Sequence, residues 1–320
     1  MAEEKNFRSL STLVPGDKLE MECYLLREAS VATARDGKPY LDGVIADKDT
    51  SMPIRIWDYR GPVDATDAGA IVCVSGAIGD YKGRIQANLT YIRRALPMDK
   101  YDEEDLIPKA PINAENAKAQ LECLLDSISD AELKTVCKEA YAAFGKDFVA
   151  YPAAKKIHHA FKHGLLMHTL NMMVIADQLA RIYPITNRDM LLAGTFLHDL
   201  GKLSELTLGD TGLVSEYSLE GELLGHLVIG AEAVATACKN LGVSREKSLM
   251  LQHMLVSHHG EPEYGAAKLP ATPEAILLSM IDAMDSRMEI VTETLNGVNP
   301  GEFSERIPVL DNRKLYKPTF

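Results

Sequence analysis

Histidine and aspartate side chains that could bind a metal ion are concentrated in one third of this chain. All nine histidines of the 320 residues lie between His158 and His259. The central pair is His198-Asp199, which is followed closely by Gly201. Adjacent side chains can reach one ion only where the backbone is locally well defined; here an apolar run leads into the pair, and the glycine predicts a helix end. The pattern favours a metal-assisted phosphoester hydrolase.

Further histidines and aspartates recur at widely separated helical positions around this pair. Imidazole and carboxylate groups together suit borderline to hard divalent cations such as Mn²⁺, Fe²⁺, Zn²⁺ or Mg²⁺. One catalytic ion needs about three or four protein ligands and an open position for water, so the supply here leaves room for a second ion. The candidate ligands are His168, His198, Asp199, His226, His258 and Asp282.

Taken singly, several of these residues have a simpler interpretation. A lone histidine in an apolar segment, such as His168 or His226, is more often a core residue bonded to a carbonyl than a ligand. His258-His259 is a stronger signal, because paired imidazoles at the end of an apolar helix are costly to bury unless something binds them. His253 lies about 140° around a helix from His258, so it is expected to be structural.

Asp282 and Asp285 lie three residues apart and therefore share one face of a predicted helix. One of them could bind metal while the other orients a ligand or pairs with Arg287. As isolated features such aspartates more often belong to a solvated face. Their occurrence together with the histidines favours the functional interpretation.

Composition excludes some classes of protein. The net charge of −12 argues against a broad basic face that coats duplex DNA. Residues 1–95 carry 13 basic and 14 acidic side chains, against 21 and 32 in the remainder, so any nucleic-acid affinity would be local. Five scattered cysteines without a Cys-x-x-Cys motif predict reduced thiols and no disulfide. With no membrane-length apolar run and no signal peptide, a cytoplasmic protein without a membrane partner is expected.

The chain is predicted to have two domains of different class. Alternating apolar residues separated by turn signals predict about five short strands within residues 1–95, the size of an OB-like β-barrel. Residues 96–113 form a predicted linker with three prolines and an acidic cluster. Residues 114–320 are predicted to be an all-α domain, in which Asn113 or Asn116 and then Ser129 or Asp130 cap the first helices. Later helices are expected near 165–182, 188–199, 222–241, 244–258 and 273–294.

The ordered set of these residues resembles the HD superfamily of metal-dependent phosphohydrolases, and within it the YhaM family of 3′–5′ exoribonucleases. The resemblance covers nearly the whole chain, because an OB-like domain and a linker also precede the HD domain in that family. A family member often has two glycines where this chain has His163-Gly164, and an acidic residue at Met167. The matching segments are His158-His159-Ala160-Phe161, Gly164-Leu165-Leu166, His168-Thr169-Leu170, His198-Asp199-Leu200-Gly201-Lys202, Gly225-His226, Ser257-His258-His259-Gly260 and Asp282-Ala283-Met284-Asp285.

This resemblance implies a role for each residue in metal binding, phosphate binding or proton donation. His168, His198, Asp199 and Asp282 would hold a primary ion, most plausibly Mn²⁺, with Mg²⁺, Fe²⁺, Zn²⁺ or Co²⁺ open. His226 and His258 would hold a second ion or contact phosphate, and Asp199 could bridge two ions. Lys202 is expected to contact phosphate, and His159 and His259 to donate to phosphate or protonate the leaving group.

The strand domain would guide single-stranded RNA or DNA, with Lys82 and Arg84 as the expected contacts and aromatic side chains as stacking surfaces. Trp57 is assigned instead to the barrel core. Two other functions stay open: an HD-type nucleotidase or cyclic-nucleotide phosphodiesterase, and a non-catalytic nucleic-acid-binding protein with a structural metal. The sequence also leaves a homo-oligomer open.

Overall fold

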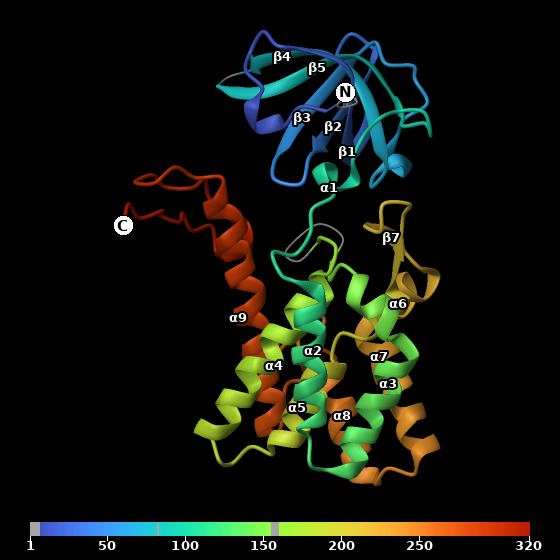
Figure 1. The fold of residues 1–320 in the computed structure, drawn as a ribbon, viewed down its shortest axis with the longest axis vertical. Coiled ribbons are helices and arrows are strands. Elements are labelled where there is room, and N and C mark those ends of the chain that lie inside the picture. The colour runs from blue at the N-terminus through green and yellow to red at the C-terminus, as the bar shows by residue number, and fades with distance from the viewer. Residues whose placement is uncertain (1–6, 82, 155–159) are drawn as a thin grey trace. The chain divides into compact units, whose positions relative to one another are not determined.

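The computed structural model describes residues 7–81, 83–154 and 160–320. The chain divides into two compact units. The barrel unit comprises residues 1–109 and 208–215, and the helical unit comprises residues 110–207 and 216–320. The predicted architecture, a small β-barrel followed by a mainly helical region, is confirmed (Figure 1).

A closed five-stranded barrel forms the first unit, with strand order β1-β2-β3-β5-β4. β3 and β5 pair in parallel, whereas the other neighbouring strands pair antiparallel. A closed barrel leaves no long unpaired strand edge. The strands are β1 (Lys18–Thr33), β2 (Pro39–Ala46), β3 (Ser51–Trp57), β4 (Ile71–Tyr81) and β5 (Arg84–Arg94).

Alternation along β3 decides which of its side chains enter the barrel. Ile54 and Ile56 are buried, while Arg55 and Trp57 between and after them point outward. The prediction that Trp57 belongs to the core is therefore wrong, because strand periodicity places it on the opposite face from the isoleucines. Its side chain is 59% exposed.

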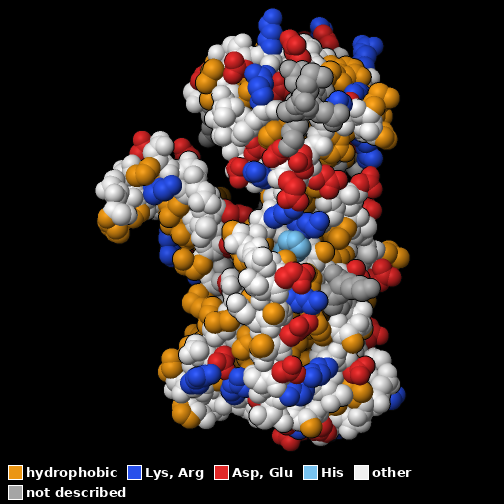
Figure 2. Space-filling model, viewed as in Figure 1, with side chains coloured by type: hydrophobic (Ala, Val, Ile, Leu, Met, Phe, Trp, Pro, Cys, Tyr) orange, Lys and Arg blue, Asp and Glu red, His pale blue; other side chains and the backbone are white. Residues whose placement is uncertain are grey.

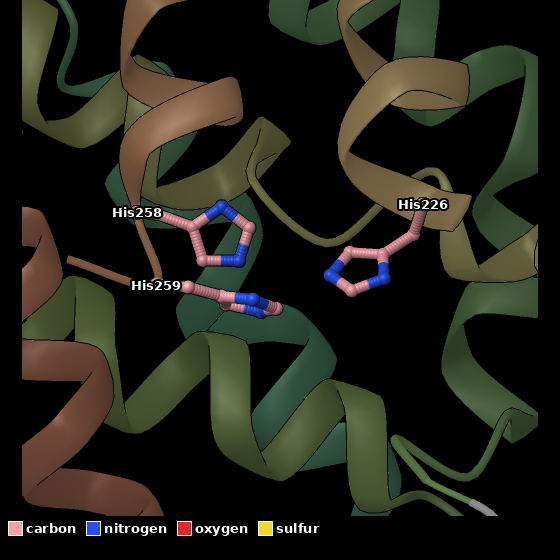
Figure 3. Close-up of side chains that lie close together, drawn as sticks. All are labelled: His226, His258 and His259. Atoms are coloured by element: carbon pink, nitrogen blue, oxygen red, sulfur yellow. The ribbon is translucent and has the colours of Figure 1, made fainter. Parts of the chain in front are cut away.

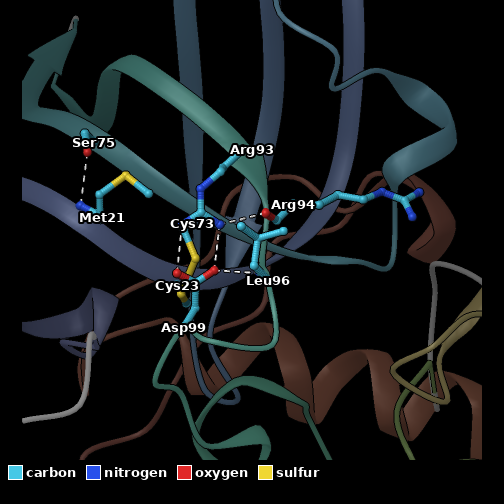
Figure 4. The surroundings of a disulfide bond; sticks show 8 residues. All are labelled: Met21, Cys23, Cys73, Ser75, Arg93, Arg94, Leu96 and Asp99. Carbon is cyan, nitrogen blue, oxygen red and sulfur yellow. Dashed lines mark hydrogen bonds and ion pairs between the residues drawn. A yellow bond between two sulfur atoms is a disulfide. The ribbon is translucent and has the colours of Figure 1, made fainter.

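Cys23 and Cys73 form a disulfide between β1 and β4 (Figure 4). The prediction of reduced cysteines is thus wrong for this pair. The strand register places the two residues opposite each other, with Cα atoms 4.1 Å apart, although they are 50 residues apart in sequence. Cys123, Cys137 and Cys238 are free thiols.

Part of the predicted linker belongs to the barrel unit. The short helix α1 (Glu103–Leu106) begins after Asp102, whose carboxylate accepts a hydrogen bond from the backbone N–H of Glu104. Leu106 and Ile107 are buried in the hydrophobic core of the barrel. Residues 96–109 therefore belong to the barrel unit.

The helical unit is built from helices that largely match the predicted spans. Of the caps predicted as alternatives, the Asn113 and Asp130 side chains are the ones that cap its first two helices. The helices are α2 (Ala114–Asp126), α3 (Ala131–Ala150), α4 (Gly164–Ile182), α5 (Arg188–Leu197), α6 (Lys202–Glu205), α7 (Leu219–Leu241), α8 (Arg245–Ser257) and α9 (Pro273–Asn296). A two-stranded sheet pairs β6 (Leu206–Leu208) with β7 (Val214–Tyr217), and short 3-10 helices are η1 (Leu10–Thr12), η2 (Ala65–Asp67), η3 (Pro262–Tyr264) and η4 (Pro308–Leu310).

Helix α7 has two unusual properties. Its backbone leaves helical geometry at Gly225, where φ is 72°, a value that favours glycine. Within the described residues, it is also the one helix that is long and apolar enough to cross a membrane, which makes it an exception to the predicted absence of such a segment. Length and composition alone are weak grounds, because core helices of soluble proteins meet the same criteria.

Charges of both signs are mixed over the barrel. On the face shown in Figure 2, Lys and Arg side chains are interspersed with Asp and Glu side chains. Among the described residues on that face there is no broad basic patch. Any affinity of this surface for nucleic acid must therefore depend on more than net charge.

Candidate metal centre

Five helical segments bring the predicted ligands together in the helical unit. His168 lies in the first half of α4, and His198-Asp199 directly follows α5. His226 comes just after the backbone break in α7, His258-His259 directly follows α8, and Asp282 lies within α9. These positions are far apart in sequence, so only the packing of the helices brings the ligands together.

The Asp199 carboxylate is the centre of the cluster. Its Oδ2 atom lies 3.3 Å from His198 Nε2 and 3.7 Å from His168 Nε2. Its Oδ1 atom lies 3.6 Å from His226 Nε2 and 3.7 Å from His258 Nε2. Each oxygen therefore faces a separate pair of imidazoles, an arrangement suited to one ion or to two ions that share the carboxylate.

Three ligand atoms in this cluster are buried without a hydrogen-bond partner: His198 Nε2, Asp199 Oδ1 and His226 Nε2. Burying a polar atom without a partner is costly, and burying a charged carboxylate oxygen costs more still. A divalent cation would satisfy all three atoms. Potential ligand atoms form triads in which every pair lies within 4.8 Å; these triads are His168-His198-Asp282, His198-Asp199-His258 and His226-His258-His259.

A second layer of groups orients the imidazoles through their Nδ1 atoms. In each case Nδ1–H donates to an oxygen on the outer side, which turns Nε2 toward the centre. This common orientation fits metal ligation better than four unrelated core histidines would. The acceptors are Asp285 Oδ2 for His168 at 2.7 Å, the Thr195 carbonyl for His198 at 2.7 Å, Glu205 Oε1 for His226 at 3.0 Å and the Leu255 carbonyl for His258 at 2.8 Å.

Glu205 is a functional candidate that sequence reasoning missed. Its Oε1 atom accepts hydrogen bonds from both the backbone N–H and the Nδ1–H of His226, each at 3.0 Å. The break at Gly225 lets the backbone of His226 turn toward this carboxylate. The one available signal was the position of Glu205 three residues after Lys202, close behind the His-Asp pair.

Gly201 allows α6 to approach α7 closely. A Cβ atom at this position would lie 2.2 Å from the His226 carbonyl oxygen and 2.9 Å from the Gly230 nitrogen. The glycine is therefore required for packing next to the ligand His226. Its φ of −59° is ordinary, so its role as the predicted helix stop is secondary to this close approach.

Lys202 neutralises the central carboxylate. Its Nζ atom lies 2.7 Å from Asp199 Oδ2, and both side chains are largely buried. Burial has the largest single effect on the pKa of Asp199 and raises it, but the neighbouring His198 and Lys202 together hold that pKa well below its usual range. Burial favours a lower pKa of Lys202, but the negative charge of Asp199 outweighs the effect of burial, so the pKa of Lys202 is raised. Both groups are therefore charged at neutral pH.

His168 and His258 differ in protonation. Burial lowers the pKa of His168, but hydrogen bonds to Asp282 and Asp285 outweigh that effect and raise it to about 9. Burial, followed by the neighbouring His198, lowers the pKa of His258 well below its usual value. His258 is thus already a neutral ligand at pH 7, whereas His168 must lose a proton before it can bind metal.

His259 lies beside the ligands on the side of His226. In Figure 3 the His226, His258 and His259 side chains converge from α7 and from the end of α8. The ring centroid of His259 is 4.5 Å from that of His258 and 5.1 Å from that of His226. His259 thus lies within reach of a group bound at His226 and His258.

A pocket opens over this cluster and combines two kinds of surface. Its polar part includes His168, Asp199, Lys202 and Asp282, and α9 extends the lining by a further turn with Arg287. Apolar side chains form another part of the lining. Such a pocket can hold an anionic phosphate next to a less polar sugar or base. The apolar lining residues are Ala153, Ala283, Ile290 and Val309.

The remaining predicted residues have different outcomes. His253 lies outside the described triads, and its Nε2 atom accepts a hydrogen bond from the Ala271 N–H at 2.9 Å. His159 and Lys82 lie outside the described residues. Arg84 begins β5, but its side chain also lies outside what the structure describes. Roles for these last three residues stay predictions.

We expect Glu205→Gln to lower the affinity for Mn²⁺ by about ten- to hundredfold, because the ring of His226 loses its charged acceptor. Isothermal titration of the metal-free protein with Mn²⁺ measures this change. Glu222→Gln is the matched control, because Glu222 lies on α7, the helix that carries His226, and is exposed. Equal affinities for the two variants would show that Glu205 does not position a ligand.

Comparison with known proteins agrees with this geometry. The HD domain family model matches residues 165–287, which include every predicted metal ligand. A 3′-5′ exoribonuclease YhaM from Listeria innocua is 38% identical over 304 residues, covering 94% of this chain and 96% of that protein. Proteins of the same name from Halalkalibacterium halodurans (35% identical; 95% and 94% covered) and Bacillus licheniformis (36%; 94% and 96%) are also similar. The chain therefore belongs to the YhaM 3′–5′ exoribonuclease family.

Proposed function

We propose that this chain removes nucleotides from the 3′ end of single-stranded RNA in a reaction that requires a divalent metal. The observation that carries this proposal is the buried ligand cluster, in which His198 Nε2, Asp199 Oδ1 and His226 Nε2 have no hydrogen-bond partner. The names of the YhaM relatives support the choice of RNA and of the 3′–5′ direction. The barrel that precedes the site supports a polymer rather than a free nucleotide as substrate.

The residues present fit a divalent cation held by imidazole and carboxylate groups. We assign His168, His198, Asp199 and Asp282 to a first ion, and His226 and His258 to a second. A mixed nitrogen and oxygen ligand set suits Mn²⁺, which is our first choice, and also accommodates Fe²⁺, Zn²⁺, Co²⁺ or, less well, Mg²⁺. When bound, such an ion lowers the pKa of water and offsets negative charge on the phosphate.

The protein groups around the cluster supply the rest of the chemistry. Lys202 keeps its positive charge beside Asp199, so it can reduce the repulsion between the carboxylate and an incoming phosphate. Asp285 and Glu205 hold their histidines in one orientation before substrate arrives, which reduces the reorganisation needed during the reaction. His259 lines the pocket, and we assign to it the donation of a proton to the leaving oxygen.

One assay tests this proposal against the alternative functions. Purified protein with Mn²⁺ is offered 5′-labelled single-stranded RNA, the matching DNA, mononucleotides and cyclic nucleotides. A ladder that shortens from the 3′ end of the RNA is the expected result. Release of phosphate from mononucleotides alone, or opening of cyclic nucleotides alone, would instead assign the site to a nucleotidase or a phosphodiesterase. Inactivity with every substrate would favour a binding protein with a structural metal.

We expect the affinity for Mn²⁺ to rise by about tenfold per pH unit between pH 7 and pH 9, and to level off above pH 9. The pKa of His168 is raised to about 9, so below that pH a proton competes with the metal for this ligand. Titration with Mn²⁺ at a series of pH values measures the slope. In Asp285→Asn, which removes one charged partner of His168, the plateau should begin at lower pH. Mn²⁺ affinities that depend on pH in the same way in the two proteins would contradict the assignment of His168 as a metal ligand held by Asp285.

A further inference from the structure

A pair of aromatic rings, one exposed and one partly exposed, lies on the outer face of the barrel. Tyr40 on β2 and Trp57 on β3 are directly opposite each other in the strand register. Their ring centroids are 5.3 Å apart and their planes are inclined by 40°. Trp57 is 59% exposed, and it is the single tryptophan of the chain. Its inward neighbours Ile54 and Ile56 already fill the core, so the indole adds little to barrel packing.

A guanidinium group extends this aromatic surface. The Cζ atom of Arg55 lies 5.4 Å from the Tyr40 ring centroid and 5.3 Å from the Trp57 ring centroid. Arg55 also donates two hydrogen bonds to Asp42 Oδ1, from Nε at 2.9 Å and from Nη2 at 2.6 Å. The carboxylate fixes the orientation of the guanidinium and is itself neutralised. The group formed by Tyr40, Asp42, Arg55 and Trp57 is termed the aromatic platform.

Polar amides continue the same face on the next strand. Arg55 is opposite Asn88 in the parallel pairing of β3 with β5. The Gln86 side-chain amide donates to Asn88 Oδ1 at 2.8 Å, and the Asn88 side chain is exposed. The platform thus combines two aromatic rings with neighbouring neutral hydrogen-bonding groups. Nucleobases offer the matching chemistry, namely a flat face for stacking and an edge for hydrogen bonds.

We propose that the aromatic platform binds unpaired bases of single-stranded RNA by stacking on Trp57 and Tyr40. This inference rests on the proposed exoribonuclease function and adds to it a binding site separate from the predicted contacts Lys82 and Arg84. Stacking suits a chain with a net charge of −12, because it adds affinity without a broad basic surface. A duplex has no exposed base faces along its length, so the platform selects single strands.

The single tryptophan makes a direct test available. The full-length protein carries Asp199→Asn so that RNA stays intact, and a twelve-nucleotide oligouridylate is titrated while Trp57 emission is recorded. We expect quenching by the single strand and none by a blunt duplex of the same length. Fluorescence anisotropy of labelled RNA should show that Trp57→Ala weakens binding by about tenfold, whereas Trp57→Phe retains most of the affinity.

Tyr91→Ala is the matched control, because Tyr91 is another exposed aromatic residue of the barrel, on β5. Equal weakening by Tyr91→Ala and Trp57→Ala would overturn the proposal, since affinity would then follow exposed aromatic area in general. Unchanged Trp57 emission would also overturn it. The proposed function is tested separately by degradation of RNA by the unsubstituted enzyme, so degradation without quenching would reject the platform alone.

Discussion

Asp199→Asn is expected to lower the rate of RNA hydrolysis by at least about a thousandfold, which corresponds to about 4 kcal/mol of lost transition-state stabilisation. Among the described ion pairs, Asp199 is the side chain that faces both groups of imidazoles, through its Oδ1 and Oδ2 atoms. The amide keeps the shape of the side chain but removes its charge. It therefore weakens every ion site that includes this residue, and the rate of 3′ shortening measures the effect.

Loss of a buried carboxylate could also act by unfolding the helical unit, so a second buried aspartate serves as the control. Asp177 is buried on α4, where it pairs with Arg181 at 2.7 Å and Arg188 at 2.6 Å. Asp177→Asn should lower thermal stability but retain hydrolysis at a temperature where the protein is folded. Comparable rates for Asp199→Asn and the unsubstituted protein would remove Asp199 from the catalytic site.

Removal of metal by a chelator is expected to abolish hydrolysis, and Mn²⁺ is expected to restore it. The same treatment should lower thermal stability, because a ligand at a hundredfold excess over its dissociation constant stabilises the folded state by about 2.7 kcal/mol. For a unit of this size the midpoint of unfolding should fall by several degrees. Differential scanning calorimetry with and without Mn²⁺ measures this shift.

The control for the chelation experiment is the His198→Gln variant, which lacks one ligand with a buried unpartnered atom. Its unfolding midpoint should respond little to Mn²⁺. A midpoint that rises equally in both proteins would place the stabilising ion elsewhere. Hydrolysis that survives complete removal of metal would contradict the proposed reaction, whatever the effect on stability.

The helical unit could be predicted well because its apolar periodicity is strong and its caps are local. The spans expected near 165–182 and 273–294 agree with α4 and α9 to within a few residues. The order of the ligands along the chain then indicated the family and, through it, the site. This success depended on the joint pattern, since His168 or Asp282 alone would have suggested a core or surface residue.

What could not be predicted depends on contacts between distant residues. Glu205 interacts with His226 through a backbone break that periodicity does not reveal. Cys23 and Cys73 meet because the β1–β4 register places them opposite each other, and a shift of one residue would separate them. Trp57 was assigned to the core by residue type, but its place in the alternation of β3 decides its exposure.

The hydrogen bond between His168 and Asp285 joins residues that are 117 positions apart. A cation bound beside it would tie α4 and α9 to the segments that carry Asp199, His226 and His258, and would close several long loops at once. Closing such loops removes conformational freedom from the unfolded chain, much as a cross-link does. The bound cation would then stabilise the fold as well as take part in the reaction. It would hold α9, which carries Asp282 and Asp285, against His168 on α4, so loss of the metal would promote fraying of α9.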